Sequence, residues 1–161
     1  MNMRKLVVII YSLVLLFAGC DDLEDKPYTT GEANGVVEDY GTAEMYILNE
    51  GLFNLNNSTL ARYSFLTNSC SYDYFRALNH RGLGDTANDM DIYGSKLYVV
   101  VNVSSTVEVI DLQSGLSVKQ IPMLTDNGSS RQPRAITFDS GKAYVCSYDG
   151  TVARIDTASL E

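Results

Sequence analysis

Tryptophan is absent from the 161 residues, histidine occurs once, and cysteine occurs three times. The absence of tryptophan argues against the class of repeat whose unit carries a Trp–Asp pair. No second histidine or cysteine stands at metal-ligand spacing from His80, and no serine lies in a nucleophile-elbow motif. Basic residues are few, with 12 Lys and Arg against 20 Asp and Glu and a net charge of −8. Such a surface repels phosphates, so we set nucleic acids aside as partners.

The apolar run near the N-terminus is too short to span a bilayer. Leu6 to Ala18 has the length of a signal-peptide core and follows the basic residues Arg4 and Lys5. It ends in Leu-Phe-Ala-Gly-Cys at 16–20, which resembles the bacterial lipobox, where small residues precede a cysteine that is lipidated and becomes the new N-terminus. We predict a signal peptide over residues 1–19 and lipidation of Cys20. An ordinary secretory signal with a chance cysteine is the alternative.

Residues 20–42 are predicted to be a lipidated acidic linker rich in Gly, Thr, Asn and acids. Four acidic residues follow the cysteine almost at once: Asp21, Asp22, Glu24 and Asp25. They read equally well as a solvated spacer or as a run that resembles the surface-export signal of Bacteroidetes lipoproteins. We predict a lipid-anchored protein of the outer membrane, at the cell surface.

The rest of the chain repeats one pattern. Tyr98 and Tyr144 are 46 residues apart, and Asp111 and Asp156 are 45 apart, within stretches that match each other. The apolar runs are short, β-branched and aromatic, and are separated by Gly and Asp-Ser, which predicts strands rather than helices. A repeat of about 45 residues made of such runs is typical of a four-stranded propeller blade.

The predicted fold is therefore all-β, a β-propeller with four-stranded blades over residues 43–161. Blade one covers about 43–80 and lacks its innermost strand; its strands are predicted at Ala43–Leu48, Thr59–Phe65 and Cys70–Leu78. Blade two covers about 87–123, with strands at Asp89–Tyr93, Leu97–Asn102, Thr106–Leu112 and Ser117–Pro122. Blade three covers about 133–161, from Pro133 to a third strand near Thr157.

Each blade is expected to be apolar on both faces, because each packs between two neighbours. Val99, Val100 and Val101 in a row need cover on two sides. Ring closure normally takes four or more blades. We therefore expect this sequence to be the N-terminal part of a longer protein, holding about two and a half to three blades.

The long polar loops are predicted to share one rim of the blades, where binding usually resides. The candidate ligand-binding residues on it are Glu50, Phe53, Asn54, Asn102, Arg131, Arg134 and Tyr148. Each has a structural alternative. Glu50 and Arg134 would pair with each other or cap strands, Phe53 would plug the rim, and Arg134 would be positional because it follows Pro133.

The other reactive residues are predicted to be structural. His80 lies in a Gly-rich loop and is expected at the surface, and no metal site is predicted. Asp85 and Asp89 could act as paired carboxylates, but a turn or calcium-loop role is the stronger interpretation. Cys70 and Cys146, two blades apart, are expected not to pair and to be small core residues.

Several motifs, in order, resemble a known family. Tyr-Ile-Leu-Asn-Glu-Gly at 46–51, Gly-Asp-Thr-Ala at 84–87, Tyr-Val-Val-Val-Asn at 98–102 and Pro133-Arg134 look like the YVTN-type β-propeller surface lipoproteins of Bacteroidetes. The likeness covers Ala43 to Thr157. It implies a seven-bladed ring. Some members of the family are similar to the lipoprotein that captures vitamin B12, so the resemblance implies cobalamin as a possible ligand and an outer-membrane TonB-dependent transporter as a partner.

The resulting hypothesis is a ligand-binding module rather than an enzyme, with no cofactor of its own. It is anchored through Cys20 and holds a ligand, such as a corrinoid, for a transporter. The alternative is a structural or interaction propeller with protein or glycan partners and no small-molecule ligand. A propeller lyase or quinoprotein would need His, Arg or acid residues clustered on several blades, and only one histidine is present.

Overall fold

The computed structural model describes residues 44–161. The predicted signal peptide, Cys20, the acidic linker and Ala43 lie outside the described residues. Within 44–161 the elements are β1 (Glu44–Asn49), β2 (Thr59–Ser64), β3 (Ser69–Ser71), α2 (Tyr74–Asn79), β4 (Ala87–Tyr93), β5 (Lys96–Val101), β6 (Thr106–Asp111), β7 (Ser117–Pro122), β8 (Pro133–Asp139), β9 (Lys142–Ser147) and β10 (Val152–Asp156).

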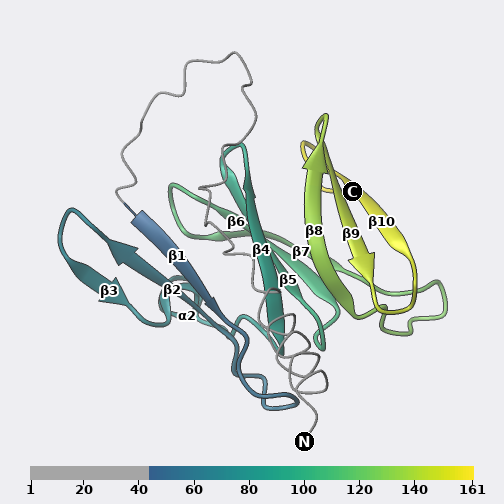
Figure 1. The fold of residues 1–161 in the computed structure, drawn as a ribbon, viewed down its shortest axis with the longest axis horizontal. Helices are drawn as coiled ribbons and strands as arrows, with labels where there is room; N and C mark the ends of the chain where they lie inside the picture. The colour runs from purple at the N-terminus through teal and green to yellow at the C-terminus, as the bar shows by residue number, and fades with distance from the viewer. Residues whose placement is uncertain (1–43) are drawn as a thin grey trace, which may run out of the picture. The chain divides into compact units, whose positions relative to one another are not determined.

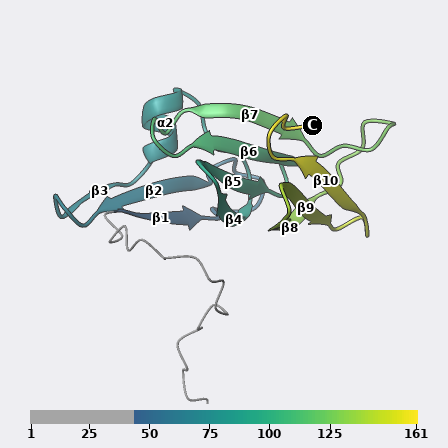
Figure 2. The same cartoon turned by 90° about the horizontal axis from the view of Figure 1, so that it is seen from above.

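The strands form three antiparallel sheets in chain order (Figures 1 and 2). The first sheet is β1–β2–β3, the second is β4–β5–β6–β7, and the third is β8–β9–β10. Every strand pairs only with strands adjacent to it in the chain, as in a meander. The all-β prediction is confirmed at this level, and no closed ring is present among the described residues.

Three tyrosines show that the sheets are repeats of one unit. Tyr46, Tyr98 and Tyr144 are each the third residue of their strand, β1, β5 and β9. Opposite them on the next strand lie Arg62, Val109 and Arg154, respectively. The positions deduced from the sequence repeat are therefore equivalent in space.

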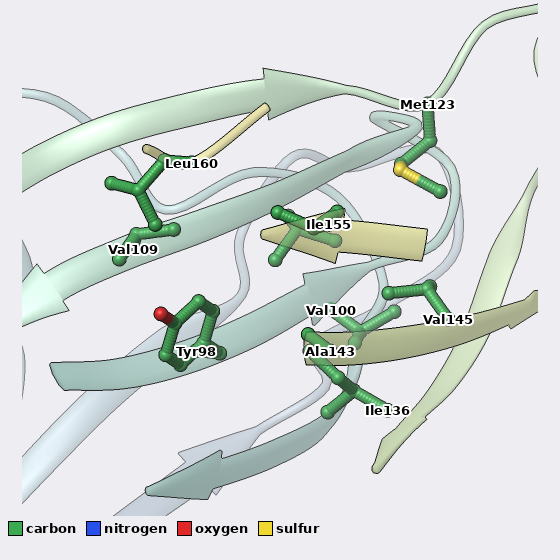
Figure 3. Packing of buried hydrophobic residues seen from close by; sticks show 10 residues of the cluster. Tyr98, Val100, Val109, Met123, Ile136, Ala143, Val145, Ile155 and Leu160 are labelled. Atoms are coloured by element: carbon green, nitrogen blue, oxygen red, sulfur yellow. The ribbon is translucent and has the colours of Figure 1, made fainter. Parts of the chain in front are cut away.

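One core lies between the second and third sheets (Figure 3). Alternate residues of β5 and β6 point into it, namely Tyr98, Val100, Val107 and Val109, all fully buried. Ala143, Val145 and Ile155 face them from the third sheet. Burial of a Val or Leu side chain stabilises by about 1.5–3 kcal/mol, so this layer is a major part of what holds the two sheets together.

A second core lies on the other face of the second sheet. Leu97, Val99 and Val101 point into it and meet Leu60 of β2 and Phe75 of α2. β5 is thus buried on both faces, as predicted for a blade between two neighbours.

The prediction of a strand over Cys70–Leu78 was wrong. Only Ser69–Ser71 forms a strand, and Tyr74–Asn79 is a helix. The Asp73 side chain caps the helix by accepting from the Arg76 N–H, and His80 ends it in the left-handed conformation, exposed as expected. The helix buries Tyr74 and Phe75 against the second core, which an extended strand could not do with adjacent residues.

Cys70 and Cys146 are both free thiols, on the first and third sheets. The prediction that both are core residues was wrong: Cys70 is only half-buried and belongs to neither core, and Cys146 is exposed. It occupies the position of Val100 in the repeat, but on the face of the third sheet that no described residue covers.

Candidate functional site

The loops at one end of the strands are joined into a continuous surface, here called the loop rim. It consists of residues 50–58, 80–86, 102–105, 123–132 and 148–151. Backbone hydrogen bonds link successive loops: Ser58 N–H to the Gly84 carbonyl at 3.0 Å, Asn102 N–H to the Thr86 carbonyl at 2.9 Å. The predicted clustering of these loops is therefore seen in the contacts that join them.

The carboxylate of Asp85 organises the first half of the loop rim. It accepts the N–H groups of Asn54 at 3.1 Å and Asn56 at 2.9 Å, both in the left-handed conformation. The Asp85 carbonyl accepts the N–H of Val103, and the Ser104 hydroxyl accepts the Asp85 N–H at 2.8 Å. Asp85 thereby fixes loop 50–58 to the loop after β5.

Hydrogen bonds to the carboxylate also set its protonation. The hydroxyl of Thr86 donates to Oδ1 at 2.7 Å and, with the Asn56 and Asn54 N–H groups, holds the pKa of Asp85 below its usual range. Asp85 is an ionised scaffold residue with its acceptor sites occupied. This corresponds to the turn role rather than to acid–base chemistry.

Asn102 joins the second sheet to the third. Its side-chain amide donates to the Pro133 carbonyl at 2.9 Å, and the residue is buried. Its side chain thus supports the start of β8 instead of pointing to solvent.

Arg131 and Tyr148 lie at the third-sheet end of the loop rim. The Arg131 guanidinium donates to the Leu124 carbonyl at 3.0 Å and to Thr151 Oγ1 at 3.0 Å, and contacts Asp149 at 3.4 Å. Its donors are largely used within the loops. Tyr148 is held by its backbone, which donates to the Gln132 carbonyl at 2.9 Å, and its side chain is 76% exposed.

Two β-bulges place side chains at the rim ends of β4 and β8, the first strands of the second and third sheets. The register shifts between Ala87 and Asp89 in β4 and between Pro133 and Ala135 in β8, so Asn88 and Arg134 are the extra residues. They are 46 residues apart, at equivalent positions of the repeat. Bulges next to binding sites commonly re-aim a side chain, and Arg134 is exposed here.

A cavity of about 360 Å³ opens beside the bulge of β4. Its lining residues come from β1, the residue that follows it, and β4: Leu48, Glu50, Ala87, Asn88, Asp89 and Met90. Both polar atoms of the Asn88 amide are buried and have no hydrogen-bond partner among the described residues. A buried amide without partners is costly and is usually satisfied by a ligand or water.

The Asp89 carboxylate at this cavity is already engaged. One oxygen accepts the Ile136 N–H at 2.8 Å and the other the Met90 N–H at 2.9 Å. Asp89 therefore ties the second sheet to the third. No group of three or more His, Cys, Asp or Glu residues that could hold a metal occurs in 44–161.

The seven predicted residues fall into two classes. Glu50, Phe53, Arg134 and Tyr148 present side chains that are available, and Phe53 is 69% exposed. Asn102 and Arg131 are used within the scaffold, and the Asn54 backbone is bonded to Asp85. Glu50 and Arg134 do not form an ion pair within the described part of the chain. Asn88 was missed, although its 46-residue offset from Arg134 signals it.

None of the helical structure within 44–161 combines the length and the apolar character that a membrane crossing requires.

Comparisons with known proteins leave the family open. No family model matches the chain, and no curated protein matches it. Among solved structures, hydrazine synthase of Kuenenia stuttgartiensis is similar with a TM-score of 0.47 and 22% identity over 64% of this chain and 28% of that one. The computationally designed Ika8 protein gives 0.48 and 14% over 73% and 33%. The designed Ika4 protein gives 0.43 and 16% over 66% and 62%. The chain thus spans less than two thirds of each of these proteins.

Proposed function

We propose that the three sheets are successive blades of a β-propeller that is lipid-anchored at the outer membrane through Cys20 and binds a ligand at its loop rim. The observation that carries this proposal is the pair of bulges that set Asn88 and Arg134 at the same end of successive innermost strands. In a propeller the innermost strands surround the central axis. Side chains at their rim ends would therefore converge on one axial site.

The chemistry available at this end suits a polar ligand with an apolar body. Glu50 and Arg134 supply opposite charges, and the orphaned Asn88 amide supplies a donor and an acceptor. Phe53 and Tyr148 add exposed aromatic surface on two different loops. This combination favours binding over catalysis, because the acids that have many hydrogen bonds, Asp85 and Asp89, are occupied within the scaffold.

The ligand that we propose is a corrinoid, delivered to a TonB-dependent transporter, on the ground of the family resemblance. A cavity of about 360 Å³ is at the small end of ligand pockets. A corrinoid would therefore lie across the loop rim and insert only an edge beside Glu50.

Titration of the full chain with cyanocobalamin tests this. We expect binding at micromolar concentration, weakened at least about tenfold by Arg134→Ala or Phe53→Ala, each of which removes one contact worth about 1.4 kcal/mol. Leu66→Ala is the matched control, because Leu66 is an exposed apolar residue in the β2–β3 turn at the opposite end. No binding at micromolar levels would remove the corrinoid from the proposal.

One observation favours the alternative, a propeller that binds a protein partner. Loop 50–58 exposes three large apolar side chains close together, Leu52, Phe53 and Leu55. Contiguous exposed apolar residues mark protein interfaces more often than small-ligand sites. Capture of an envelope protein that depends on Leu52 and Leu55, without any effect of cyanocobalamin, would support this function instead.

A further inference from the structure

The loop between β7 and β8 carries the one Asn-Gly pair within residues 44–161, Asn127-Gly128. The loop protrudes beyond the strands (Figure 2), and every residue from Asp126 to Ser130 is exposed. Gly128 has φ +82°, and a Cβ added to it would meet nothing within 4 Å. A glycine at this position leaves its backbone nitrogen free of a side chain that would hinder its approach to the preceding amide.

The side-chain amide oxygen of Asn127 is held by two donors from its own turn. The Thr125 hydroxyl donates to Oδ1, and the Ser129 N–H donates to the same oxygen at 3.2 Å, shared with Thr125 Oγ1 at 3.0 Å. Negative charge develops on an amide oxygen when a nucleophile adds to its carbon, and preorganised donors stabilise that charge. The turn therefore favours attack on the Asn127 amide.

The nucleophile is the backbone nitrogen of the next residue, so the attack is intramolecular. The Gly128 N–H donates to the Thr125 carbonyl at 2.8 Å within the turn, and this bond must open before the nitrogen can react. It can open at little cost, because the turn is exposed and no packed side chain surrounds Gly128.

We propose that Asn127 is a site of spontaneous deamidation, assisted by the two donors of its own turn. Hydroxide from water removes the Gly128 N–H proton, the nitrogen attacks Asn127 Cγ, and a new C–N bond forms. The bond from Cγ to the side-chain nitrogen breaks, and that nitrogen takes a proton from water and leaves as ammonia. Water then hydrolyses the resulting succinimide to aspartate or isoaspartate at position 127. The loop rim gains one negative charge as the molecule ages, in a chain whose net charge is already −8.

A second turn of the loop rim has similar geometry but a different side chain. Asp149 is followed by Gly150, which has φ +84° and open space around it. Asp149 Oδ1 also accepts two donors, the hydroxyl of Thr151 at 2.6 Å and its N–H at 3.0 Å. The Thr151 hydroxyl, with its N–H and the Arg131 guanidinium, holds the pKa of Asp149 below its usual range. An ionised carboxylate resists nucleophilic attack, so Asp149 should not form a succinimide at neutral pH.

Ageing of the full chain at neutral pH and physiological temperature, followed by mass spectrometry of tryptic peptides, tests the proposal. The peptide of residues 120–131 contains Asn127, and we expect it to show the mass change from amide to acid within weeks. It should also become a substrate for an isoaspartate methyltransferase. The Asn-Gly pair at 34–35 lies outside the described residues and falls in a different peptide, so the two sites are measured separately.

Two other peptides of the same digest are internal references. One contains Asn68, which is exposed and whose amide oxygen accepts the Tyr63 hydroxyl, but which is followed by Ser69 instead of glycine. The other contains Asp149. Both should stay unchanged over the period in which Asn127 reacts.

Two variants separate the glycine from the donors. Gly128→Ala should slow the reaction at least about tenfold, because its Cβ hinders the approach of the nitrogen. Thr125→Val keeps the shape of the side chain and removes one donor. It should slow the reaction about three- to tenfold, less than the loss of about 10²–10³ in closed active sites, because water reaches this turn. Circular dichroism confirms that both variants are folded.

Two results would overturn the proposal. In the first, Asn127 stays unchanged in the folded chain but is deamidated in urea. In the second, Thr125→Val reacts faster than the unaltered chain. Either result would mean that the hydrogen bonds of the turn protect the amide instead of activating it.

Discussion

The guanidinium of Arg81 donates to the fully buried carboxylate of Glu108 at 2.8 Å. Ser117 Oγ and Gln120 Nε2 complete the site at 2.5 and 3.1 Å, and the guanidinium lies 4.9 Å from the centre of the Phe75 ring. The loop after α2, which contains Arg81, is thereby attached to β6 and β7 of the second sheet. Among the described strands, Glu108 is the one buried carboxylate, and it forms an ion pair with Arg81.

Replacing Arg81 by Ala should destabilise the chain by about 2–3 kcal/mol, because it leaves a buried carboxylate without its counter-charge. Urea unfolding measures the change. Glu108→Gln keeps the shape and removes the charge, so adding it to Arg81→Ala should restore part of the loss. Strict additivity of the two changes would show that the two residues are not coupled.

Gly115 should tolerate no side chain. A Cβ there would lie 2.1 Å from the Tyr74 hydroxyl and 2.4 Å from Leu78 Cδ1, and the backbone has φ +71°. Gly115→Ala is expected to cost about 3 kcal/mol, part strain and part displacement of α2. Gly94→Ala is the control, with φ +61° and open space around it; it should cost only about 1 kcal/mol. Equal thermal shifts for the two would contradict this packing of α2.

The Tyr98 hydroxyl is buried with no hydrogen-bond partner among the described residues, and burial raises its pKa. Tyr98→Phe should therefore leave stability unchanged or raise it by about 1 kcal/mol, since only an unpaired polar group is lost. Tyr98→Ala should cost about 4 kcal/mol because it empties the core between the second and third sheets. Chemical denaturation of the two variants separates the contribution of packing from that of the hydroxyl. A large loss of stability in Tyr98→Phe would mean that the hydroxyl has a hydrogen-bond partner.

Acid should weaken the fold through a defined set of carboxyls. Hydrogen bonds lower the pKa of four groups: Asp85, Asp111, Asp149 and Asp156. Above the ordinary value of 3.8 these groups are ionised whether folded or unfolded, so their contribution is fully present. Below it the unfolded chain binds protons first, and stability falls. The unfolding midpoint should be lower at about pH 3 than at about pH 6, and Asp156→Asn should reduce this difference. An unfolding midpoint that does not change with pH would contradict these hydrogen bonds.

The sequence predicted the strands best where the repeat is strongest. Alignment on Tyr98 and Tyr144 gave nearly every strand of the second and third sheets, because alternating apolar residues and Gly-containing turns leave one register that buries both faces. The fully buried run Val99–Val101 needed cover on both sides, and it has that cover.

The strand prediction failed in the first sheet, where a helix stabilised by tertiary packing takes the place of the strand that the repeat predicts. Cys70 to Leu78 looks extended because it is short and aromatic, but Asp73 caps a helix whose Tyr74 and Phe75 fill the space beside β2. The available signal was the capping residue Asp73 with the helix-forming run Arg-Ala-Leu at 76–78. A local pattern of nine residues did not reveal that the space was open to a helix.

The sequence predicted where the candidate site lies better than it predicted what each of its side chains does. Loop geometry placed Glu50, Phe53 and Tyr148 on exposed parts of the loop rim, and Arg134 beside it at the start of β8. It did not reveal that Asn102 and Arg131 have their donors occupied, because Asn102 donates to the carbonyl of the distant Pro133, and Arg131 donates to the Leu124 carbonyl of its own loop and to Thr151 Oγ1. Asn88 was missed because its placement depends on a bulge, for which its 46-residue offset from Arg134 was the available signal.

The strictly sequential pairing of the strands also bears on how this chain folds during synthesis. Each hairpin needs only residues that have already emerged from the ribosome, so a sheet can close before the following one has been made. The described part of the chain can thus acquire its structure one sheet at a time, in the order of synthesis.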